Sequence, residues 1–427
     1  MIDLAGIGRL LDGAWLTKGS GAVQGASIDT RTLEAGQAFF ALPGNNVDGH
    51  DYLEQATQRG AAVAIVQRPV TAALPALLVK DVRAALWRMA EHHRSTLDCH
   101  VIAVLGSNGK TTTVRMMTSV LRQAMSTYAS LRSFNNALGL PLTILNCPVG
   151  TRALVCELGE GEPGALPRFV GLARPGTAIV TSVGRAHVGA LGGEDGVRAE
   201  FAKAIKAMPS DSRVIAPPAD AWLRENPAAG VARAWHEGLH ACFELPDGSS
   251  WRLPVPGLHN ASNAAAVIAA GRHLGLSDEA IARGLDCFQP AEMRMSVRDI
   301  RGATVIVDCY NANPDSMAAA LLTARDLGKG KRVVAVIGDM LELGDRSARM
   351  HADLGRRARS MGIETVCIGP ASRAASETSG GHWYATVELA REHVTGLLAA
   401  DTVLLIKGSR SMALERLIEG VCASAVA

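Results

Sequence analysis

The chain alternates short apolar runs with longer segments in which apolar residues recur every three or four positions. Runs at residues 101–105, 153–157 and 332–337 are each long enough for one strand, and each ends at glycine or polar residues. The segments that follow several of these runs have the spacing of amphipathic helices. Strands that alternate with helices are typical of parallel sheets covered by helices. The pattern therefore predicts an α/β protein.

The length of 427 residues corresponds to about three domains, each large enough for its own core. We place a small N-terminal α/β domain at residues 1–96 and a central parallel-sheet domain at residues 97–290. A C-terminal domain, again with alternating strands and helices, occupies residues 291–427. The sequence therefore predicts three α/β domains in a row.

Composition and charge exclude several classes of protein. The net charge is +2, which argues against a dedicated nucleic-acid-binding protein. No apolar run approaches the roughly 20 residues that span a bilayer, and the N-terminal residues lack the pattern of a secretory signal. The eight cysteines contain no Cys-x-x-Cys pair, so reduced thiols are expected. We expect a cytoplasmic protein, without membrane insertion, that acts on small-molecule substrates. A monomer is expected, but the sequence, which contains no coiled-coil heptads, does not itself decide the oligomeric state.

A glycine loop, Gly-Ser-Asn-Gly-Lys-Thr at residues 106–111, follows the apolar run at 101–105 and precedes a helix-like segment. Such a loop binds phosphate, because backbone N–H groups at a helix N-terminus surround the anion, while a lysine reaches the outer phosphates and a hydroxyl can bind Mg²⁺. A bare Gly-Lys-Thr can also be an ordinary turn, but here strand, loop and helix agree. The residues predicted to bind nucleotide are Gly106, Ser107, Asn108, Gly109, Lys110, Thr111 and Thr112.

Two ionisable residues follow strands of the central domain. Glu157 ends one apolar run, and His187 follows another. The carboxyl ends of parallel strands share one edge of a sheet, so both side chains could converge on Lys110 and Thr111. Glu157 beside Thr111 would suit Mg²⁺, which prefers oxygen ligands. Taken alone, each residue is also compatible with a turn or a surface position.

Polar clusters also end three apolar runs of the C-terminal domain, at residues 303–308, 332–337 and 402–406. One such cluster would be an ordinary turn between a strand and a helix. Three of them predict a doubly wound, Rossmann-like sheet with a face for a nucleotide or another anion. The residues on this face would be Asp308, Asn311, Asn313, Asp339, Lys407 and Arg410.

Two further polar patches allow a structural or a binding role. Asn260, Ser262 and Asn263 lie at the start of an alanine-rich helix, where they could cap the helix or hydrogen-bond an adenine edge. Residues 27–31 and the loop at 43–49 could be turns, or could hold a diphosphate or a uracil, because arginine offers a forked donor and glycine turns offer N–H groups. The residues alone do not decide between these roles.

Seven ordered motifs resemble those of Mur ligases, and the resemblance covers essentially the whole chain. They lie at residues 106–111, 134–143, 157–159, 259–264, 310–317, 338–344 and 407–410. Near the N-terminus, Asp-Thr-Arg at 29–31 and Asp-Gly-His at 48–50 are similar to one subfamily, whose first domain holds a UDP-sugar. That subfamily joins D-alanyl-D-alanine to UDP-N-acetylmuramoyl-tripeptide. The resemblance therefore implies an ATP-dependent amide ligase of peptidoglycan precursor synthesis that works through an acyl phosphate.

The resemblance also implies roles for individual residues, with ATP and Mg²⁺ as cofactors. Thr111 and Glu157 would bind one Mg²⁺ and His187 a second, while Lys110 would stabilise the phosphates. Residues expected to contact the rest of the nucleotide are Asn263 and Asn313 at the adenine and Asp339 at the ribose. Residues expected to act when the C-terminal domain closes are Arg294, Lys407 and Arg410. Residues expected to face the other substrates are Asp29, Arg31, Asn45, Asn135 and Asn136.

The chain departs from the family pattern close to the expected site. Phe201 stands where most members have a lysine that becomes carbamylated and supports the second Mg²⁺. Lys203 should face away from that position, because two residues on a helix correspond to about 200°. Further departures are Leu105, Ala165, Ser182 and Gly189. Two alternatives therefore remain, a related ligase that joins another carboxylate to another amine, and a nucleotide-binding scaffold without catalysis. The retained motif residues argue against the scaffold.

Overall fold

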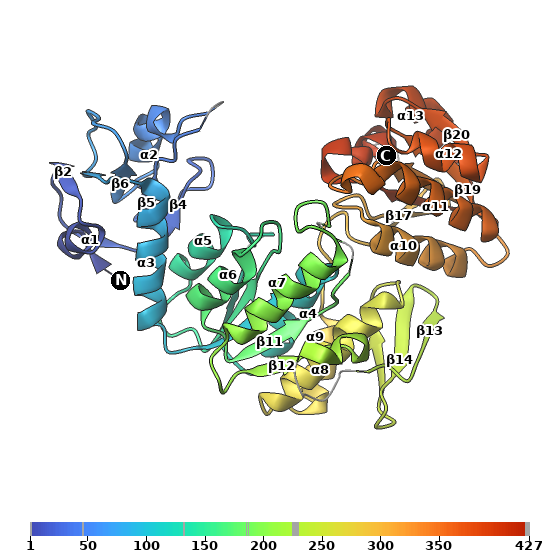
Figure 1. Ribbon diagram of the computed structural model, residues 1–427, viewed down its shortest axis with the longest axis horizontal. Coiled ribbons are helices and arrows are strands. Elements are labelled where there is room, and N and C mark those ends of the chain that lie inside the picture. The colour runs from blue at the N-terminus through green and yellow to red at the C-terminus, as the bar shows by residue number, and fades with distance from the viewer. Residues whose placement is uncertain are drawn as a thin grey trace.

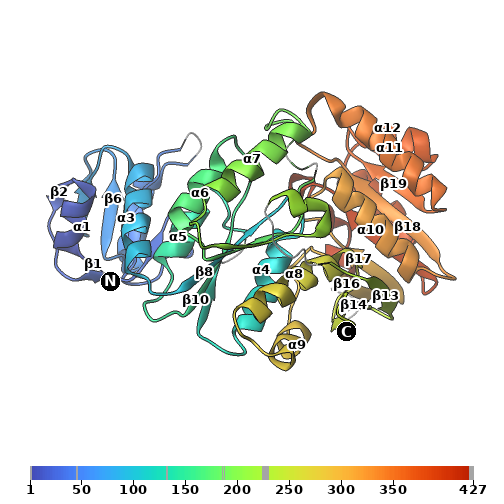
Figure 2. The ribbon, with the colours of Figure 1, turned by 60° about the horizontal axis from the view of Figure 1, so that its bottom comes forward.

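The computed structural model describes residues 2–44, 47–130, 133–184, 186, 188–223 and 230–422. Three α/β domains follow one another, and the central domain lies between the other two (Figure 1). The same order is visible from a second direction (Figure 2). Among the described residues, no helix is both long and apolar enough to cross a membrane. The predicted α/β class and the arrangement in three domains are confirmed.

The N-terminal domain contains a five-stranded sheet in the order β2-β7-β6-β5-β4, in which β2 is antiparallel to β7 and the others are parallel. Its strands are β2 (Ala14–Thr17), β4 (Ala26–Ser27), β5 (Ala38–Phe40), β6 (Val63–Val66) and β7 (Ala76–Leu78), with β1 (Ile2–Asp3) and β3 (Ala22–Val23) as a separate pair. Its helices are α1 (Leu4–Leu11), η1 (Gly49–Tyr52), α2 (Leu53–Gln58) and α3 (Val82–Thr96). Helix α3 begins at Asp81, whose carboxylate accepts hydrogen bonds from the N–H groups of Arg83 and Ala84.

The central domain contains a five-stranded parallel sheet in the order β12-β11-β8-β10-β9 and a three-stranded antiparallel sheet, β13-β14-β15. The strands are β8 (His100–Leu105), β9 (Thr127–Ala129), β10 (Ala153–Glu157), β11 (Thr177–Val180), β12 (Arg213–Ile215), β13 (Arg233–Glu237), β14 (His240–Glu244) and β15 (Ser250–Leu253). The helices are α4 (Lys110–Leu121), α5 (Gly139–Leu145), α6 (Ala165–Ala173), α7 (Glu194–Lys206), η2 (Pro218–Leu223), α8 (His259–His273) and α9 (Asp278–Asp286).

Strand β8 is buried on both of its faces, which explains the continuous apolar run in its sequence. Val101, Ala103 and Leu105 pack on the side that α3, α5, α6 and α7 cover. Ile102 and Val104 face α4, α8 and α9 on the other side. This alternation follows from the two-residue repeat of a strand. The sheet therefore lies between two apolar cores, and both cores support the loop that follows β8.

The C-terminal domain has a six-stranded sheet in the order β16-β17-β21-β18-β19-β20, parallel except for β16. The strands are β16 (Ser296–Ile300), β17 (Ala303–Val307), β18 (Arg332–Gly338), β19 (Glu364–Ile368), β20 (His382–Tyr384) and β21 (Thr402–Lys407). The helices are α10 (Pro314–Leu327), η3 (Gly344–Arg346), α11 (Ser347–Ser360), α12 (Arg373–Ser379), α13 (Val387–Gly396), η4 (Arg410–Met412), η5 (Leu414–Leu417) and α14 (Glu419–Cys422). Helices α10, α11 and α12 cover one face and α13 the other, so the predicted doubly wound sheet is present.

The hydrogen bonds of Asn146 and of Trp87 are two of the polar contacts that join the N-terminal domain to the central one. Asn146 Oδ1 accepts a hydrogen bond from the Ala26 N–H at 3.0 Å, and Asn146 Nδ2 donates to the Ala26 carbonyl at 2.9 Å. The Trp87 indole of α3 donates to the carbonyl of Ala137 at 2.8 Å. Both contacts fix β4 and α3 against the segment from Ala137 to Asn146. The N-terminal domain is thus docked beside the loop that precedes α5.

Candidate active site

A cavity of about 530 Å³ lies between the central and C-terminal domains. The central domain contributes residues 107–112, residues of the loop at 133–137, and residues 157 and 159–162 at the end of β10. The C-terminal domain contributes Arg294, Lys407 and residues of the segment 308–316. Strands β8, β10, β17 and β21 end at this cavity, as expected for ligand sites of parallel sheets. The sequence-predicted clusters of the two domains therefore face each other.

The glycine loop is held in place by the segment that follows β11. The Ser107 N–H donates to the Ser182 carbonyl at 2.8 Å, and the Gly184 N–H donates to Ser107 Oγ at 3.0 Å. Thr181 Oγ1 donates to the Asn108 carbonyl. The apolar run continues to Val183, but β11 ends at Val180, because the chain leaves the sheet there to bind the loop.

Both glycines of the loop are required by its geometry. Gly109 has a φ of +79°, and a Cβ there would lie 2.7 Å from Asn263 Oδ1. Gly106 has a φ of +145°, and a Cβ there would lie 1.9 Å from Thr181 Oγ1. Side chains at either position would combine an unfavourable backbone conformation with a clash. The loop therefore brings its backbone close to the cavity at the N-terminus of α4, the arrangement that favours an anion.

Lys110, at the end of the glycine loop, forms an ion pair with Glu160. Its Nζ donates to the Gly106 carbonyl at 2.5 Å and to Glu160 Oε2 at 2.8 Å. Glu160 is completely buried, and its Oε1 has no hydrogen-bond partner among the described residues. Sequence reasoning missed Glu160, although it follows the end of β10 by the same rule that identified Glu157. The pair leaves a buried carboxylate oxygen at the cavity wall.

Thr111 and Glu157 form an oxygen-rich cluster next to this pair. Thr111 Oγ1 donates to Glu157 Oε2 at 2.8 Å, and Asn135 Nδ2 donates to Glu157 Oε1 at 2.8 Å. Ser133 Oγ lies 3.3 Å from Thr111 Oγ1. Hydroxyl and carboxylate oxygens are ligands that suit Mg²⁺. The structure thus brings Lys110, Thr111 and Glu157 together, whereas His187 lies outside the described residues.

No group of three or more His, Cys, Asp or Glu residues able to hold a metal ion occurs within the described ranges. Phe201, in α7, is fully buried in the apolar core and offers no ligand. Lys203 is exposed, as the helical geometry predicted. The preceding Glu200 accepts backbone hydrogen bonds from Gly164 and Leu166, so it holds the start of α6.

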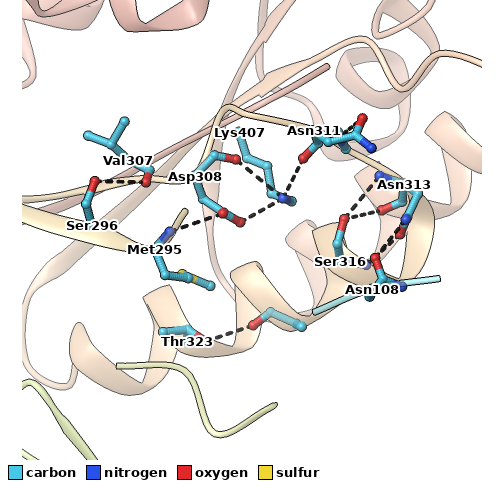
Figure 3. Close-up of polar contacts among 12 residues, drawn as sticks. Asn108, Met295, Ser296, Val307, Asp308, Asn311, Asn313, Ser316, Thr323 and Lys407 are labelled. Atoms are coloured by element: carbon cyan, nitrogen blue, oxygen red, sulfur yellow. Dashed lines mark hydrogen bonds and ion pairs between the residues drawn. The ribbon is translucent and has the colours of Figure 1, made fainter. Parts of the chain in front are cut away.

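On the opposite wall, Lys407 fixes the loop after β17. Lys407 Nζ donates to Asp308 Oδ2 at 2.7 Å and to the Asn311 carbonyl at 2.9 Å (Figure 3). Asp308 Oδ1 accepts a further bond from the Met295 N–H at 3.2 Å. Burial lowers the pKa of His259, which lines the same cavity, and the nearby Asp308 only partly opposes this shift. His259 is therefore neutral at neutral pH and can donate or accept hydrogen bonds.

Two contacts bridge the cavity directly. Asn313 Nδ2 donates to Asn108 Oδ1 at 2.8 Å, while Asn313 Oδ1 caps α10 by accepting from the Ser316 N–H (Figure 3). Arg294 Nη2 donates to Ser133 Oγ at 3.3 Å, and the Arg294 guanidinium lies 4.1 Å from the centre of the Tyr310 ring. The C-terminal domain thus contacts both the glycine loop and the loop before α5.

Four predicted nucleotide-binding residues, Gly106, Asn263, Asp339 and Arg410, do not line this cavity. The Asp339 carboxylate is buried and accepts from the Ser372 N–H at 2.7 Å. Arg410 pairs with Glu415 at 2.6 Å beside a smaller cavity of about 200 Å³. Asn263 is buried against Gly109 and donates to Asn260 Oδ1. Neither Asn260 nor Ser262 caps α8, whose N-cap is Leu258. The contacts predicted for Asp339, Arg410 and Asn263 with adenine, ribose or substrate stay predictions.

The predicted substrate residues fall in two places. Asn135 and Asn136 line the cavity, and Asn136 Oδ1 also accepts from the N–H groups of Leu138 and Gly139 at the start of α5. Asp29 and Arg31 pair with each other at 2.7 Å on the surface of the N-terminal domain, away from the cavity walls. Asn45 lies outside the described residues.

The glycine loop on a parallel sheet, faced by a doubly wound domain across a cavity, defines a P-loop nucleotide-binding enzyme whose site is shared by two domains. Three family models match the chain, each within one of the predicted domains. They are the "Mur ligase family, catalytic domain" at residues 22–95, the "Mur ligase middle domain" at 104–240 and the "Mur ligase, glutamate ligase domain" at 293–410. The chain belongs to the Mur ligase family of ATP-dependent ligases. The boundaries at 96/97 and 290/291 stay predictions.

Similar proteins match over nearly the full length. The UDP-N-acetylmuramoyl-tripeptide--D-alanyl-D-alanine ligase of Bacillus subtilis (strain 168) is 32% identical, over 94% of each chain. The enzyme of the same name from Escherichia coli (strain K12) is also 32% identical, over 94% of this chain and 96% of its own. A crystal structure of MurF from Acinetobacter baumannii has a TM-score of 0.87 and 30% identity and covers 98% of both chains. These relatives do not support the two alternative functions.

Proposed function

We propose that this protein joins D-alanyl-D-alanine to UDP-N-acetylmuramoyl-tripeptide with the energy of ATP, in peptidoglycan precursor synthesis. The observation that carries this proposal is the 32% identity over 94% of the chain to two ligases named for these substrates. The N-terminal domain, where the UDP-sugar would bind, shares in the likeness, because a family model matches residues 22–95. One chain would therefore supply both substrate recognition and the ATP site.

The reaction needs ATP because a carboxylate is a poor acyl donor to an amine. In the first step a carboxylate oxygen of the tripeptide attacks the γ-phosphorus, a P–O bond forms and ADP leaves. In the second step the amine of D-alanyl-D-alanine attacks the carbonyl carbon, the C–O bond to phosphate breaks, and the amine proton is lost. Both steps gather negative charge at the transferred phosphoryl group. Positioning and electrostatic stabilisation should therefore dominate catalysis.

The central domain would supply the positive charge. Lys110 lies at the N-terminus of α4, and residues 107–109 line the same cavity, where backbone N–H groups of the loop would bind the phosphates. Thr111 and Glu157 fit Mg²⁺, because their oxygens already lie 2.8 Å apart at the cavity wall, and His187 would join a metal site in this region. When bound, Mg²⁺ would neutralise charge on the phosphates.

The remaining residues would hold the acyl substrate and close the site. Asn135 and Asn136 lie on the cavity wall that leads toward the N-terminal domain, where Asp29, Arg31 and Asn45 would contact the UDP-sugar. Arg294 and Asn313 reach across from the C-terminal domain to Ser133 and Asn108. These contacts support closure around ATP, with the adenine and ribose held by Asn263, Asn313 and Asp339, and with Lys407 and Arg410 in the closing domain. Closure would keep water away from the acyl phosphate.

The test is phosphate release by the purified protein with ATP, Mg²⁺, UDP-N-acetylmuramoyl-tripeptide and D-alanyl-D-alanine. Each substrate is omitted in turn, and the mass of the product is measured. We expect phosphate and the pentapeptide product only when all substrates are present. Bound ATP without any product would contradict this substrate assignment, and a panel of other acids and amines would then identify the true pair.

A further inference from the structure

Glu160 is a buried carboxylate with one satisfied and one unsatisfied oxygen. Its Oε2 accepts from Lys110 Nζ at 2.8 Å, and its Oε1 has no partner among the described residues. The side chain is fully buried yet belongs to the cavity wall. A buried carboxylate oxygen without a partner is costly, so such a group indicates a ligand that is absent from the protein alone.

The other carboxylates close to this place are already engaged or exposed. Both oxygens of Glu157 accept hydrogen bonds, from Thr111 and Asn135. Both oxygens of Glu200 accept backbone hydrogen bonds at the start of α6. Glu162 lines the cavity but is exposed, so water can satisfy it. Glu160 Oε1 is thus distinguished from these neighbours as a buried acceptor in need of a donor or a cation.

Entry of ATP changes the charge balance around Glu160. The proposed function makes Lys110 the cation of the phosphate loop, and in the structure this same ammonium neutralises Glu160. When Lys110 turns to the phosphates, Glu160 is left buried beside several negative charges. A buried charge that loses its partner is strongly destabilising unless another cation replaces that partner. A divalent cation that bridges phosphate and carboxylate oxygens would meet this need.

We propose that Glu160 binds a divalent cation that enters with the nucleotide, and that Lys110 moves from Glu160 to the phosphates as this cation arrives. Phe201, on helix α7, offers no oxygen ligand, whereas Glu160 supplies a buried carboxylate oxygen that has no partner among the described residues. The ion pair between Lys110 and Glu160 is then the resting form of the site. This inference rests on the proposed function, because it requires ATP in the cavity.

The test measures Mn²⁺ bound to the full-length protein in the presence of a non-hydrolysable ATP analogue, by titration with electron paramagnetic resonance detection. The variant Glu160→Gln keeps the shape of the side chain but removes its charge, and Glu162→Gln is the matched control on the same loop. We expect Glu160→Gln to weaken the binding of one Mn²⁺ by about 10- to 100-fold. Glu162→Gln should bind Mn²⁺ like the wild type.

The affinity for the analogue in the absence of metal helps to show whether Glu160 is a metal ligand or only the counter-ion of Lys110. We expect Glu160→Gln to bind the metal-free analogue at least as tightly as the wild type, because a negative charge near the phosphates is removed. If Glu160→Gln tightens analogue binding but leaves both the number and the affinity of bound Mn²⁺ unchanged, Glu160 is only the counter-ion of Lys110 and the proposal is overturned.

A measurement on the unaltered protein covers the case in which Glu160→Gln does not fold. In a crystal with the analogue and Mn²⁺, anomalous scattering should place one Mn²⁺ within bonding distance of a Glu160 oxygen. Manganese bound elsewhere, with Glu160 still on Lys110, overturns the proposal. If the wild type binds neither the analogue nor Mn²⁺, the proposed function itself fails. This outcome differs from the one that overturns only the role of Glu160, in which the wild type and Glu160→Gln bind Mn²⁺ equally well.

Discussion

Lys110 and Lys407 each pair with a carboxylate on the wall of the same cavity, but the two pairs are completed differently. Lys407 donates to Asp308 and to the Asn311 carbonyl, and the second oxygen of Asp308 accepts from the Met295 N–H. Glu160, the partner of Lys110, keeps an oxygen without a partner among the described residues. The Lys110 side chain is 12% exposed and the Lys407 side chain 3%.

The difference separates a structural ion pair from one that can exchange partners. Around Lys407 all the strong acceptors are satisfied inside one domain, so the pair fixes the loop from Asp308 to Asn313. Around Lys110 the partner is incompletely satisfied and the cavity is open to a ligand. The role of such an ion pair is therefore judged better from how completely its oxygen and nitrogen atoms are hydrogen-bonded than from the distance between them.

The largest expected effect is the loss of turnover when Lys110 is replaced. Lys110→Ala should lower ATP-dependent phosphate release by roughly 10³-fold, because the main cation at the transferred phosphoryl group is lost. The measurement is steady-state phosphate release. The double variant Lys110→Ala/Glu160→Gln also removes the unpaired carboxylate, and its thermal unfolding should resemble that of the wild type. Full activity of Lys110→Ala would falsify the assignment of the phosphate loop.

For Lys407, the main effect of replacement should be on the stability of the fold. Lys407→Met leaves Asp308, whose side chain is only 14% exposed, without its cation, and we expect the free energy of unfolding to fall by about 3–5 kcal/mol. Denaturant titration measures this change, and Lys331→Met, at an exposed lysine of the same domain, is the control. Adding Asp308→Asn should restore part of the loss. If Lys407→Met is as stable as the control, the contrast between the two lysines is wrong.

A smaller effect should come from the loop that positions Lys110. Gly109→Ala forces a side chain into a left-handed conformation and against Asn263, and should lower the free energy of unfolding by about 1–3 kcal/mol. Gly150→Ala is the matched control, because Gly150 has a φ of +87° but open space around its Cβ position. Calorimetry compares the two variants. Equal losses would mean that contact with Asn263 contributes nothing.

The smallest effect concerns the bond that joins the two walls. Asn313→Asp keeps the oxygen that caps α10 but replaces the amide donor to Asn108, so the helix should be unaffected. Loss of one hydrogen bond should raise the KM for ATP by about 2- to 10-fold. Initial-rate kinetics measure this change. An unchanged KM in a variant with normal thermal stability would show that the bridge does not assist nucleotide binding.

Local patterns in the sequence identified most of the fold and one half of the site. The strand at 153–157 and the helix after the glycine loop lie where the apolar spacing places them, because each is decided by residues close together in the chain. The convergence of Lys110, Thr111 and Glu157 follows from a general property of parallel sheets. The same rule applied to the residue three positions after Glu157 would have found Glu160.

The rest depends on contacts between distant segments. Thr181 leaves the sheet early because it bonds the glycine loop, and nothing in residues 178–183 indicates that partner. Asp339 follows a strand just as Asp308 does, but its carboxylate is turned inward to the Ser372 N–H. The bridge from Asn313 to Asn108 depends on how two domains pack. Residue type and position after a strand do not distinguish these cases.

The contact between Gly109 and Asn263 has a consequence for how the sequence can change over time. The two positions lie far apart in the chain, yet a Cβ at 109 would lie 2.7 Å from the amide oxygen at 263. A substitution at 109 would therefore require a smaller residue at position 263, in addition to the cost of the positive φ at 109. Among related sequences the two positions should vary as a pair, with asparagine at 263 recorded only alongside glycine at 109.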